Sequence, residues 1–297
     1  MTRWLVTGAG GMLGQDLTAL LRASDADVIA LARAELDVTD EAAVAAAVRE
    51  VRPDVVANCA AWTAVDDAES HEAEAMAVNG QGAAHLAAAC AKAGAQLVQM
   101  STDYVFGGTG TQPYPEDYPA APRSAYGRTK LAGERAAREL LPDASYVVRT
   151  AWLYGAHGPN FVRTMIRLEA SRDTIDVVND QQGQPTWTCD VARQIMQLVQ
   201  AAARPGVYHV SSTGWTTWMG LARAVFALLD ADPCRVLPTS TSELGRPAPR
   251  PAYSVLSHAK WASAGLAPLP DWECSLRQAF PSIASAAGRE PVGHPTA

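Results

Sequence analysis

The first 150 residues alternate short apolar runs with longer alanine-rich segments in which apolar residues recur at helical spacing. Apolar runs separated by helices indicate parallel strands that are buried on both faces. The pattern therefore predicts a doubly wound α/β sheet, whose ligands bind beyond the carboxyl ends of the strands. We expect strands at 4–7, 28–31, 54–58, 96–100 and 146–149, and helices near 12–23, 40–51, 69–93 and 124–141.

After about residue 150 this alternation becomes less regular. We expect a smaller C-terminal lobe over 151–285, with segments that return to the sheet. The polar segment 179–186 contains turn-forming residues, so we expect it to lie outside the core. The small, polar residues of 286–297 predict a disordered tail. Further expected elements are helices at 188–202, 217–230, 257–263 and 272–285, a strand at 206–210, and a surface loop at 233–251, where prolines are frequent.

Charge and cysteine content exclude several classes of protein. The net charge of −7 argues against nucleic-acid binding and leaves nucleotides open. Five dispersed cysteines without C-x-x-C spacing are typical of reduced intracellular thiols, and the scattered histidines suggest no metal site. The chain enters its first strand at once, and no apolar run reaches the roughly 18 residues of a membrane span. We expect a cytoplasmic protein without membrane or nucleic-acid partners, either a monomer or a weak homodimer.

Three glycines follow the first expected strand and open the first helix. Gly8 permits a tight turn, Gly11 allows the backbone to approach a pyrophosphate, and Gly14 allows the helix to pack against the strand. The anion would meet free N–H groups at the helix N-terminus. Such a turn can simply connect a strand to a helix, but its context here is that of a dinucleotide site. We therefore predict an NAD(P)-binding Rossmann domain over 1–150.

The end of the second strand faces the adenosine ribose in such domains. An acidic residue there favours NAD, and an arginine accommodates the 2′-phosphate of NADP. Arg33 lies near this position and favours NADPH, although an exposed loop arginine is an equally good interpretation. Asp37 is placed to meet the adenine edge, and Asp40 is typical of a helix N-cap.

The candidate chemistry depends on Tyr126 and Lys130, which lie four residues apart and share one helix face. A cation one turn away would stabilise the phenolate and bring the tyrosine pKa towards neutrality. By itself the pair is typical of many helix surfaces. Its weight comes from Thr102, at the end of the fourth strand, which can donate a hydrogen bond to a carbonyl oxygen opposite Tyr126. The three groups would polarise a ketone while a nicotinamide delivers hydride.

Four motifs follow one another in a recognisable order: the glycine turn, the segment 58–66, the stretch 101–106, and the helix start 126–130. In this order they resemble the extended short-chain dehydrogenases and, more narrowly, the dTDP-4-dehydrorhamnose reductase family, from residue 3 to about residue 280. The resemblance implies that NAD(P)H reduces the C4 keto group of dTDP-4-dehydro-β-L-rhamnose. The product would be dTDP-L-rhamnose, a precursor of cell-surface polysaccharide. NADPH is favoured, and NADH is the alternative.

The resemblance also implies which residues bind the ligands. Tyr126 would be the proton donor, and Lys130 would also hold the nicotinamide ribose. Arg250 would pair with the diphosphate. Taken alone, Trp152 is typical of a core residue and Arg250 of a solvated loop. The implied cofactor contacts are Gly8, Gly11, Met12, Leu13, Gly14, Arg33, Asp37, Val38, Ala60, Ala61, Trp62, Tyr126 and Lys130. The implied substrate contacts, from both the Rossmann domain and the C-terminal lobe, are Val65, Asp66, Thr102, Asp103, Tyr104, Trp152, Asn160, Gln184 and Arg250.

The sequence departs from the family pattern at three positions. Trp62 stands where some relatives have histidine, which alters the packing beside the nicotinamide. Gln15 and Cys189 stand where some members bind a metal through glutamates across a dimer interface. We therefore expect no metal-bridged dimer.

Related enzymes of the same fold dehydrate or epimerise sugars, and dehydratases carry a glutamate directly after the aspartate that follows the catalytic threonine. Here Tyr104 stands at that position, which favours simple reduction. Two alternatives stay open. One is reduction of another nucleotide-linked 4-keto sugar. The other is a non-catalytic NADP-binding regulatory subunit, against which the complete set of Thr102, Tyr126 and Lys130 argues.

Overall fold

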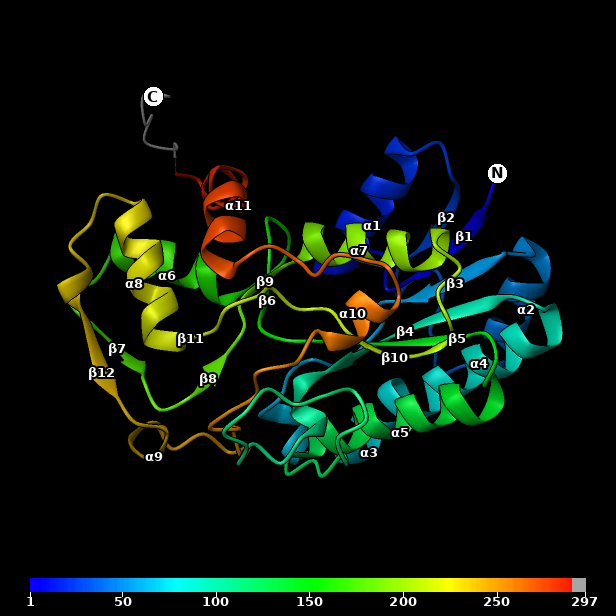
Figure 1. Ribbon diagram of the computed structural model, residues 1–297, viewed down its shortest axis with the longest axis horizontal. Helices are drawn as coiled ribbons and strands as arrows, with labels where there is room; N and C mark the ends of the chain where they lie inside the picture. Colours follow the sequence, from blue (N-terminus) through cyan, green and yellow to red (C-terminus); the bar gives the residue numbers. More distant parts are fainter. Residues whose placement is uncertain (290–297) are drawn as a thin grey trace.

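Six parallel strands form the central sheet of the computed structural model, which describes residues 1–289 (Figure 1). Chain progression reverses between β1 and β3, which creates the switch point at which such sheets bind ligands. The doubly wound fold and all five strands expected in the first half are confirmed. In spatial order the strands are β2 (Asp27–Leu31), β1 (Arg3–Thr7), β3 (Val55–Asn58), β4 (Gln96–Thr102), β5 (Ser145–Thr150) and β10 (Gly206–His209).

The strand register aligns polar side chains at the carboxyl ends of the central strands. Thr7 pairs in register with Asn58, and Asn58 pairs with Gln99. Thr7 Oγ1 donates to Asn58 Oδ1 (2.7 Å), and Asn58 Nδ2 donates to Gln99 Oε1 (2.8 Å). This buried ladder fixes the ends of β1, β3 and β4 relative to one another, below the place where the ligands are expected.

Helices cover both faces of the sheet (Figure 1). One face carries α1 (Met12–Ala23), α7 (Thr188–Gln200) and α10 (Ala259–Ser263). The other carries α2 (Glu41–Val51), α4 (Gly82–Ala93) and α5 (Ala125–Leu140). Leu13, Leu17 and Leu21 pack with Ile195 in the core of the first face, as the helical spacing predicts. Thus α7, β10 and α10 come from the second half of the chain but complete the sheet layers.

The C-terminal lobe has its own core, built from α6 (Phe161–Glu169), α8 (Trp218–Leu228) and α11 (Trp272–Ala286). In Figure 1 these helices lie at the left of the sheet. Short strand pairs connect them: β7 (Ile175–Val178) with β12 (Val236–Thr239), β6 (Leu153–Tyr154) with β9 (Thr186–Trp187), and β8 (Gln182–Gly183) with β11 (Thr216–Thr217). The α9 turn (Thr241–Leu244) follows β12.

The helix expected at 69–93 is wrong as a single element. The chain instead forms α3 (Glu72–Met76), a π-helical turn (Ala77–Gln81) and α4, after a short 3₁₀ turn at Asp67–Glu69. The π turn carries Asn79, which is 2% exposed. Its amide bonds with the backbone of Trp62 and with the Thr129 hydroxyl. A π turn holds one residue more than an α-helical turn, and these contacts explain why the chain keeps it here. Such turns are common near functional sites.

Two further expectations for the C-terminal half are wrong. The surface loop expected at 233–251 contains β12, because Val236 is fully buried against the lobe core. The polar segment 179–186 is also largely buried: Gln184 is 2% exposed and Thr186 is not exposed. Their polar atoms are hydrogen-bonded inside the protein, which removes the cost of burial. Most of the tail predicted to be disordered, 290–297, lies outside the described residues.

Candidate active site

The glycine turn has the geometry of an anion-binding helix start. Gly8 has φ +65°, and a Cβ atom there would lie 2.4 Å from the Ala60 nitrogen. A Cβ atom on Gly14 would lie 2.4 Å from the Gly8 oxygen, so the helix packs directly on the turn. Gly11 is the N-cap of α1, without a side-chain cap or an acidic residue in the first turn. The free N–H groups there fit a pyrophosphate.

The neighbouring residues of this turn divide into two kinds. Leu13 is 7% exposed and belongs to the core, so only its backbone faces the anion site. Met12 is half-buried, and its sulfur lies 3.7 Å from the Asn160 amide nitrogen. Gln15 donates to the Gly10 carbonyl oxygen (2.9 Å). Among residues 1–289, no three metal-ligating side chains gather in a way that would hold an ion.

The loop after β3 lies against the glycine turn, at the switch point. The Ala60 nitrogen donates to Asn58 (3.2 Å), and Ala61 and Trp62 follow as half-buried residues. The Asn79 side chain accepts a hydrogen bond from the backbone nitrogen of Trp62 (2.9 Å) and donates one to its backbone oxygen (3.1 Å). Trp62 and Tyr126 both pack against the small buried cluster of Ala68, Ala75 and Ala125. The predicted cofactor loop therefore reaches the candidate catalytic tyrosine.

The residues predicted to meet the adenosine half follow β2. Arg33 is exposed, whereas Val38 is 3% exposed and packs against Gly82. One oxygen of Asp37 accepts from both the nitrogen (2.9 Å) and the hydroxyl (2.8 Å) of Thr39. These hydrogen bonds lower the pKa of Asp37, so the carboxylate stays charged beside Arg33. Its second oxygen is left for a ligand.

Helix α5 places Tyr126 near the end of β4, where Thr102 lies. Ser124 caps α5 by accepting from the Gly127 nitrogen (3.1 Å), which places Tyr126 in the first turn. A Cβ atom on Gly127 would lie 2.3 Å from the Tyr104 oxygen, so α5 packs tightly on the segment after β4. The Tyr126 ring lies edge-on to Tyr104, with the ring centres 5.6 Å apart, and the Thr102 hydroxyl lies close enough to lower the pKa of Tyr126.

The predicted effect of Lys130 on Tyr126 is wrong. Burial raises the pKa of Tyr126, the hydrogen bond with Thr102 lowers it only in part, and Asp103 and Tyr104 raise it further. Lys130 instead directs its Nζ to the Met100 carbonyl oxygen at 2.6 Å. Desolvation therefore outweighs any stabilisation of the phenolate. A tyrosine held protonated is suited to donate a proton, which is what a reduction requires.

Lys130 is 3% exposed, and burial lowers its pKa to about 8, against the opposing charge of Glu134. The Met100 carbonyl is its one hydrogen-bond partner among residues 1–289. An ammonium group has three donors, so donors remain for a ligand. This arrangement fits the predicted contact with ribose hydroxyls.

Asp103 is 2% exposed and lies beside Thr102 and Tyr126. Thr102 Oγ1 donates to Asp103 Oδ1 (3.0 Å), whereas Oδ2 has no partner within the described chain. Burial raises the pKa of Asp103 to about 6, although the hydroxyls of Ser254 and Thr102 lower it in part. An unpaired buried carboxylate oxygen is costly, and a substrate hydroxyl would satisfy it.

Arg250 reaches this region from the C-terminal segment. Its Nη2 lies 2.9 Å from Asp66, and its guanidinium lies 5.8 Å from the centre of the Tyr104 ring. Its Nη1 is buried without a partner in residues 1–289. Burial raises the pKa of Tyr104 to about 12, which Arg250 opposes. Val65, half-buried, precedes Asp66, so the predicted substrate residues at 65–66, 103–104 and 250 do meet.

Trp152 belongs to an aromatic stack in the C-terminal lobe. Its ring lies 3.6 Å from that of Trp218, with the two planes 8° apart. Gly183 packs against the indole, because a Cβ atom there would lie 2.4 Å from the Trp152 ring. Trp152 has φ +44°, a strained conformation for a tryptophan. It is only half-buried, so it is not a simple core residue.

Two predicted substrate residues have their polar atoms engaged elsewhere. Asn160 caps α6 by accepting from Arg163 and donates to the Gly155 oxygen (2.9 Å), beside Met12. Gln184 accepts from Ser211 and Leu256 and donates to the Leu256 oxygen. These contacts connect segments of the protein, and direct binding of substrate by either residue stays a prediction.

Sequence analysis missed three residues that organise the site: Asn79, Glu134 and Arg149. Arg149 lies in a strand that is otherwise apolar, and a charge in such a strand requires a buried partner. Glu134 follows Lys130 by one helical turn. Both signals were present in the sequence. Asn79 carried no comparable signal, because a lone polar residue in a helical window is ordinary.

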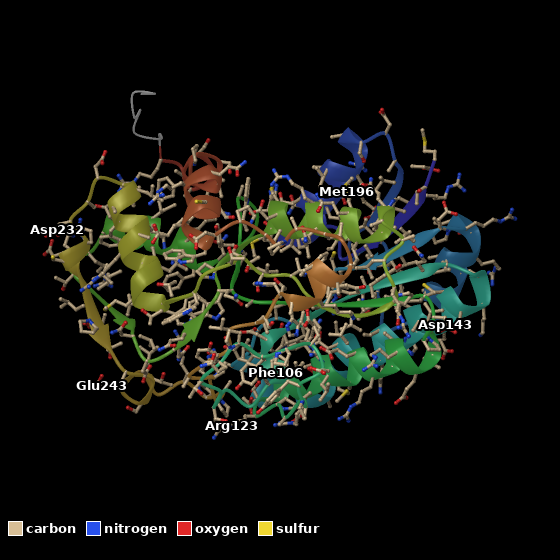
Figure 2. All side chains as sticks on the ribbon, viewed as in Figure 1. Phe106, Arg123, Asp143, Met196, Asp232 and Glu243 are labelled. Atoms are coloured by element: carbon tan, nitrogen blue, oxygen red, sulfur yellow. The ribbon has the colours of Figure 1, made fainter. Side chains whose placement is uncertain are left out.

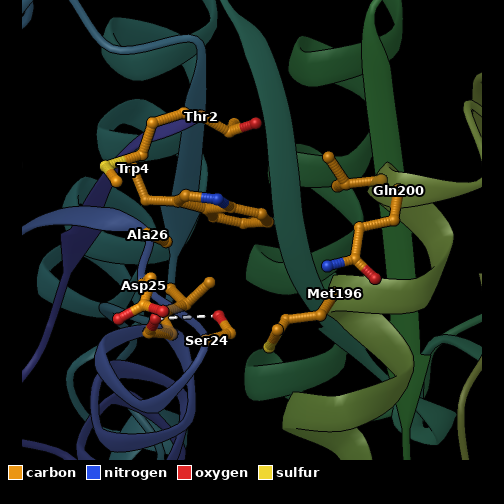
Figure 3. Close-up of a pocket in the computed structure, with 10 residues that line it drawn as sticks. Thr2, Trp4, Ser24, Asp25, Ala26, Met196 and Gln200 are labelled. Carbon is orange, nitrogen blue, oxygen red and sulfur yellow. Dashed lines mark hydrogen bonds between the residues drawn. The ribbon is translucent and has the colours of Figure 1, made fainter.

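The larger surface hollow lies away from these residues. It is lined by Trp4, Asp25, Met196 and Gln200, near the amino ends of the strands and between α1 and α7 (Figure 3). A small hollow beside Tyr104 is bordered by Phe106 and Arg123, both labelled in Figure 2. Because ligands of doubly wound sheets bind at the carboxyl ends, the second region is the relevant one. Over residues 1–289, no helix is both long and apolar enough to cross a membrane.

Fold and site together define a class of protein: a dinucleotide-dependent oxidoreductase of the short-chain dehydrogenase type. The glycine turn has the geometry of an anion-binding helix start, and α5 brings Tyr126 and Lys130 against β4, which ends at Thr102. The family model described as the RmlD substrate binding domain matches residues 2–284. The chain belongs to this family.

Its relatives share nearly the whole chain. A dTDP-4-dehydrorhamnose reductase of Streptomyces griseus is 59% identical and covers 98% of this chain and 97% of the relative. A dTDP-4-keto-6-deoxy-D-glucose reductase of Streptomyces niveus is 53% identical, covering 95% and 97%. A crystal structure of dTDP-4-dehydrorhamnose reductase from Bacillus anthracis, in complex with NADP, has a TM-score of 0.91 at 40% identity. It covers 94% of this chain and 98% of that one.

Proposed function

We propose that the protein reduces the C4 keto group of dTDP-4-dehydro-β-L-rhamnose with NADPH to give dTDP-L-rhamnose. The observation that carries this proposal is the packing of α5 on the end of β4, where Lys130 reaches Met100 and Tyr126 lies against Tyr104, two residues after Thr102. The name and the nearly complete coverage of the Streptomyces griseus relative support the choice of substrate. The NADP in the Bacillus anthracis structure supports the choice of cofactor.

The chain offers a site for each half of the dinucleotide. The N-terminus of α1 would hold the pyrophosphate, Arg33 would pair with the 2′-phosphate, and Lys130 would hold the nicotinamide ribose. The bound nicotinamide supplies a hydride. No residue among 1–289 can donate a hydride, so the protein contributes binding, orientation and proton transfer.

Tyr126 donates the proton in the proposed reaction. Its hydroxyl is protonated at neutral pH, as for an ordinary tyrosine, and burial raises its pKa further, while the nearby Thr102 hydroxyl lowers it in part. A ketone oxygen placed between the two hydroxyls accepts both hydrogen bonds, which polarises the carbonyl. When C4 receives hydride, the Tyr126 proton moves to the oxygen and leaves a phenolate.

Two features favour reduction over dehydration. Removal of water across adjacent carbons needs an additional acid and base. Asp103 is followed by Tyr104, whose pKa of about 12 makes it a poor base. The site therefore has one carboxylate, with a phenol beside it, at the end of β4.

The reaction is tested by supplying purified protein with NADPH and dTDP-4-dehydrorhamnose generated in situ, with NADH in a parallel assay. Substrate-dependent loss of NADPH absorbance, with dTDP-rhamnose as the product, is the expected result. If no nucleotide-linked keto sugar is reduced although NADPH binds, the reductase proposal fails.

A second candidate is reduction of another dTDP-linked 4-keto sugar. It is favoured by the name of the 53% identical Streptomyces niveus relative. Side-by-side rates with dTDP-4-dehydro-L-rhamnose and dTDP-4-keto-6-deoxy-D-glucose distinguish the two. A higher kcat/KM for the rhamnose precursor supports the first function, and the reverse ratio supports the second.

We further propose a cytoplasmic location, a monomer or weak homodimer, and the division into a cofactor domain over 1–150 and a mainly substrate-binding lobe over 151–285. A separate apolar core of α6, α8 and α11 supports the division, and α7, β10 and α10 are segments of the second half that return to the sheet. Size-exclusion chromatography with light scattering tests the oligomeric state, for which a mass near that of one or two chains is expected.

A further inference from the structure

A buried ion pair lies directly behind the candidate catalytic residues. Glu134 is on α5, one turn after Lys130, and is 2% exposed. Arg149 of β5 donates to both of its oxygens, Nε to Oε1 at 2.9 Å and Nη2 to Oε2 at 2.7 Å. Ser101 of β4 donates to Oε1 at 2.5 Å. A two-pronged pair of this kind fixes orientation as well as distance.

Arg149 is itself held from two sides. Its Nη1 donates to the backbone carbonyl oxygen of Glu116 (3.2 Å), and its guanidinium lies 5.0 Å from the ring centre of Phe106. The arginine is 4% exposed. Glu134 is therefore bound to a cation that cannot easily turn away.

The pair connects the three elements that carry the chemistry. Tyr126 and Lys130 precede Glu134 on α5, and Thr102 directly follows Ser101 on β4. Arg149 lies near the end of β5, three residues before Trp152 in the sequence. One carboxylate thus sets the position of α5 relative to the ends of β4 and β5.

Stability alone does not account for this pair. A buried ion pair gains little or nothing over well-packed apolar residues of similar volume, because desolvation offsets the attraction. Removing one partner is nevertheless costly, because it leaves the other charge buried and unpaired. The charge of Glu134 has a second effect at this position, on Lys130.

Lys130 has few charged neighbours. The Glu134 carboxylate from its own helix is the main group that favours its charged form, and the Cys59 thiol after β3 adds a smaller effect. From β4 it meets the neutral Met100 carbonyl. From β5 the nearest charge, Arg149, is paired with Glu134. Without Glu134, burial would disfavour the ammonium form of Lys130 with only the smaller Cys59 effect to oppose it.

We propose that Glu134, held by Arg149 and Ser101, is a positioning residue that keeps Lys130 charged and aligned with Tyr126 and Thr102. This inference rests on the proposed function, in which charged Lys130 holds the nicotinamide ribose. The buried pair of Glu134 and Arg149 would then serve cofactor binding as well as packing.

The test compares three variants with the wild type. Glu134→Gln removes the charge and keeps the shape. Glu134→Leu combined with Arg149→Met removes both charges together. Glu169→Gln is the matched control, because Glu169 accepts from Arg235 (2.9 Å) in the C-terminal lobe and lies in none of the elements that carry the site. For each protein we would measure the thermal midpoint, the NADPH dissociation constant across pH 6 to 10, and the pH profile of kcat.

In the wild type, NADPH affinity should fall as pH rises through the pKa of Lys130, because the neutral amine binds the ribose less well. In Glu134→Gln this fall should begin about one pH unit lower, a shift typical of losing a nearby opposite charge. The alkaline limb of kcat should move in the same direction. The double variant should regain thermal stability, but the pH at which its NADPH affinity has fallen by half should stay as low as in Glu134→Gln. Glu169→Gln should lose thermal stability without any change in the pH midpoint of NADPH binding.

Two results would overturn the proposal. One is an unchanged midpoint of NADPH binding in Glu134→Gln. The other is a double variant in which stability, midpoint and kcat all return to wild-type values, which would make the pair purely structural. If Glu134→Gln does not fold, the double variant carries the same test. Because NADPH binding needs no sugar, a wild type that reduces no keto sugar refutes the proposed function and leaves this measurement decisive.

Discussion

Replacing Asp103 with asparagine should stabilise the ligand-free protein while lowering its activity. The carboxyl is buried, and one of its oxygens has no partner in residues 1–289. Burial raises its pKa from 3.8 to about 6. A shift of about two units corresponds to about 3 kcal/mol between the two protonation states. Asparagine keeps the shape and removes the charge.

The sign of the effect depends on pH. Above pH 6 the carboxyl is ionised in the folded and the unfolded protein, so the folded state bears the full cost of the buried charge. Below pH 3.8 it is protonated in both states, and that cost disappears. The stability gained by Asp103→Asn should therefore approach about 3 kcal/mol at pH 8 and shrink steadily towards pH 4.

Chemical denaturation of both proteins at pH 8, 6 and 4.5 measures this difference. Asp190→Asn is a matched control, because that buried carboxylate is paired with Arg193 and Ser275, each at 2.6 Å. The control should lose stability at pH 8. Equal destabilisation of Asp103→Asn at all three pH values would refute the reasoning. At the same time kcat/KM for the keto sugar should fall by tenfold or more, since a charge-assisted hydrogen bond is worth about 1.5–3 kcal/mol.

Three further substitutions test the site. Tyr126→Phe should leave the NADPH dissociation constant nearly unchanged and lower kcat by roughly 10²–10⁴-fold, whereas a wild-type kcat would remove Tyr126 from the acid role. Arg250→Met should raise KM for the nucleotide sugar by about 10- to 100-fold, because a charge-assisted hydrogen bond is lost. Arg246 is more exposed, so Arg246→Met is a control that should have a small effect. Equal effects of the two substitutions would argue against a diphosphate contact. Arg33→Ser should raise KM for NADPH and leave KM for NADH unchanged, and a parallel rise in both would contradict the contact with the 2′-phosphate.

The sheet half of the molecule could be predicted because its signals are local and periodic. In α1, Leu13, Leu17 and Leu21 recur at helical spacing, and all three are buried. The helix occupies the residues that this spacing indicates. The glycine turn was equally readable, because steric contact leaves no space for a side chain at Gly8 or Gly14.

The C-terminal lobe was harder to predict for a physical reason. Several of its strands have two residues, too few to establish any alternation. Their stability comes from contacts between distant segments, such as Gln184 with Leu256. A polar residue that is buried by such a contact has the same local sequence signal as one in a surface turn. The segment 179–186 was assigned to the outside for that reason.

The expectation for Tyr126 failed for a related reason. Spacing on a helix places Lys130 and Tyr126 on one face, but it says nothing about how deeply the face is buried. In the folded protein desolvation dominates, and the Lys130 ammonium is bound to Met100. The sequence therefore predicted the correct pair and the wrong balance of electrostatic effects.

Buried polar atoms without partners give an independent indication of where ligands bind. Asp103 Oδ2, Trp62 Nε1 and Arg250 Nη1 are such atoms within the described chain, and all three belong to residues that motif analysis had assigned to ligands. Each unsatisfied atom costs about 1–3 kcal/mol, which a ligand that pairs with it would recover. Ser145 and Tyr154 also carry such atoms, so an unpaired atom alone does not locate a site. The argument holds for the first three because Asp103 bonds with Thr102, Arg250 lies over Tyr104, and Trp62 packs in the same cluster as Tyr126, where a polar sugar nucleotide would have to be held.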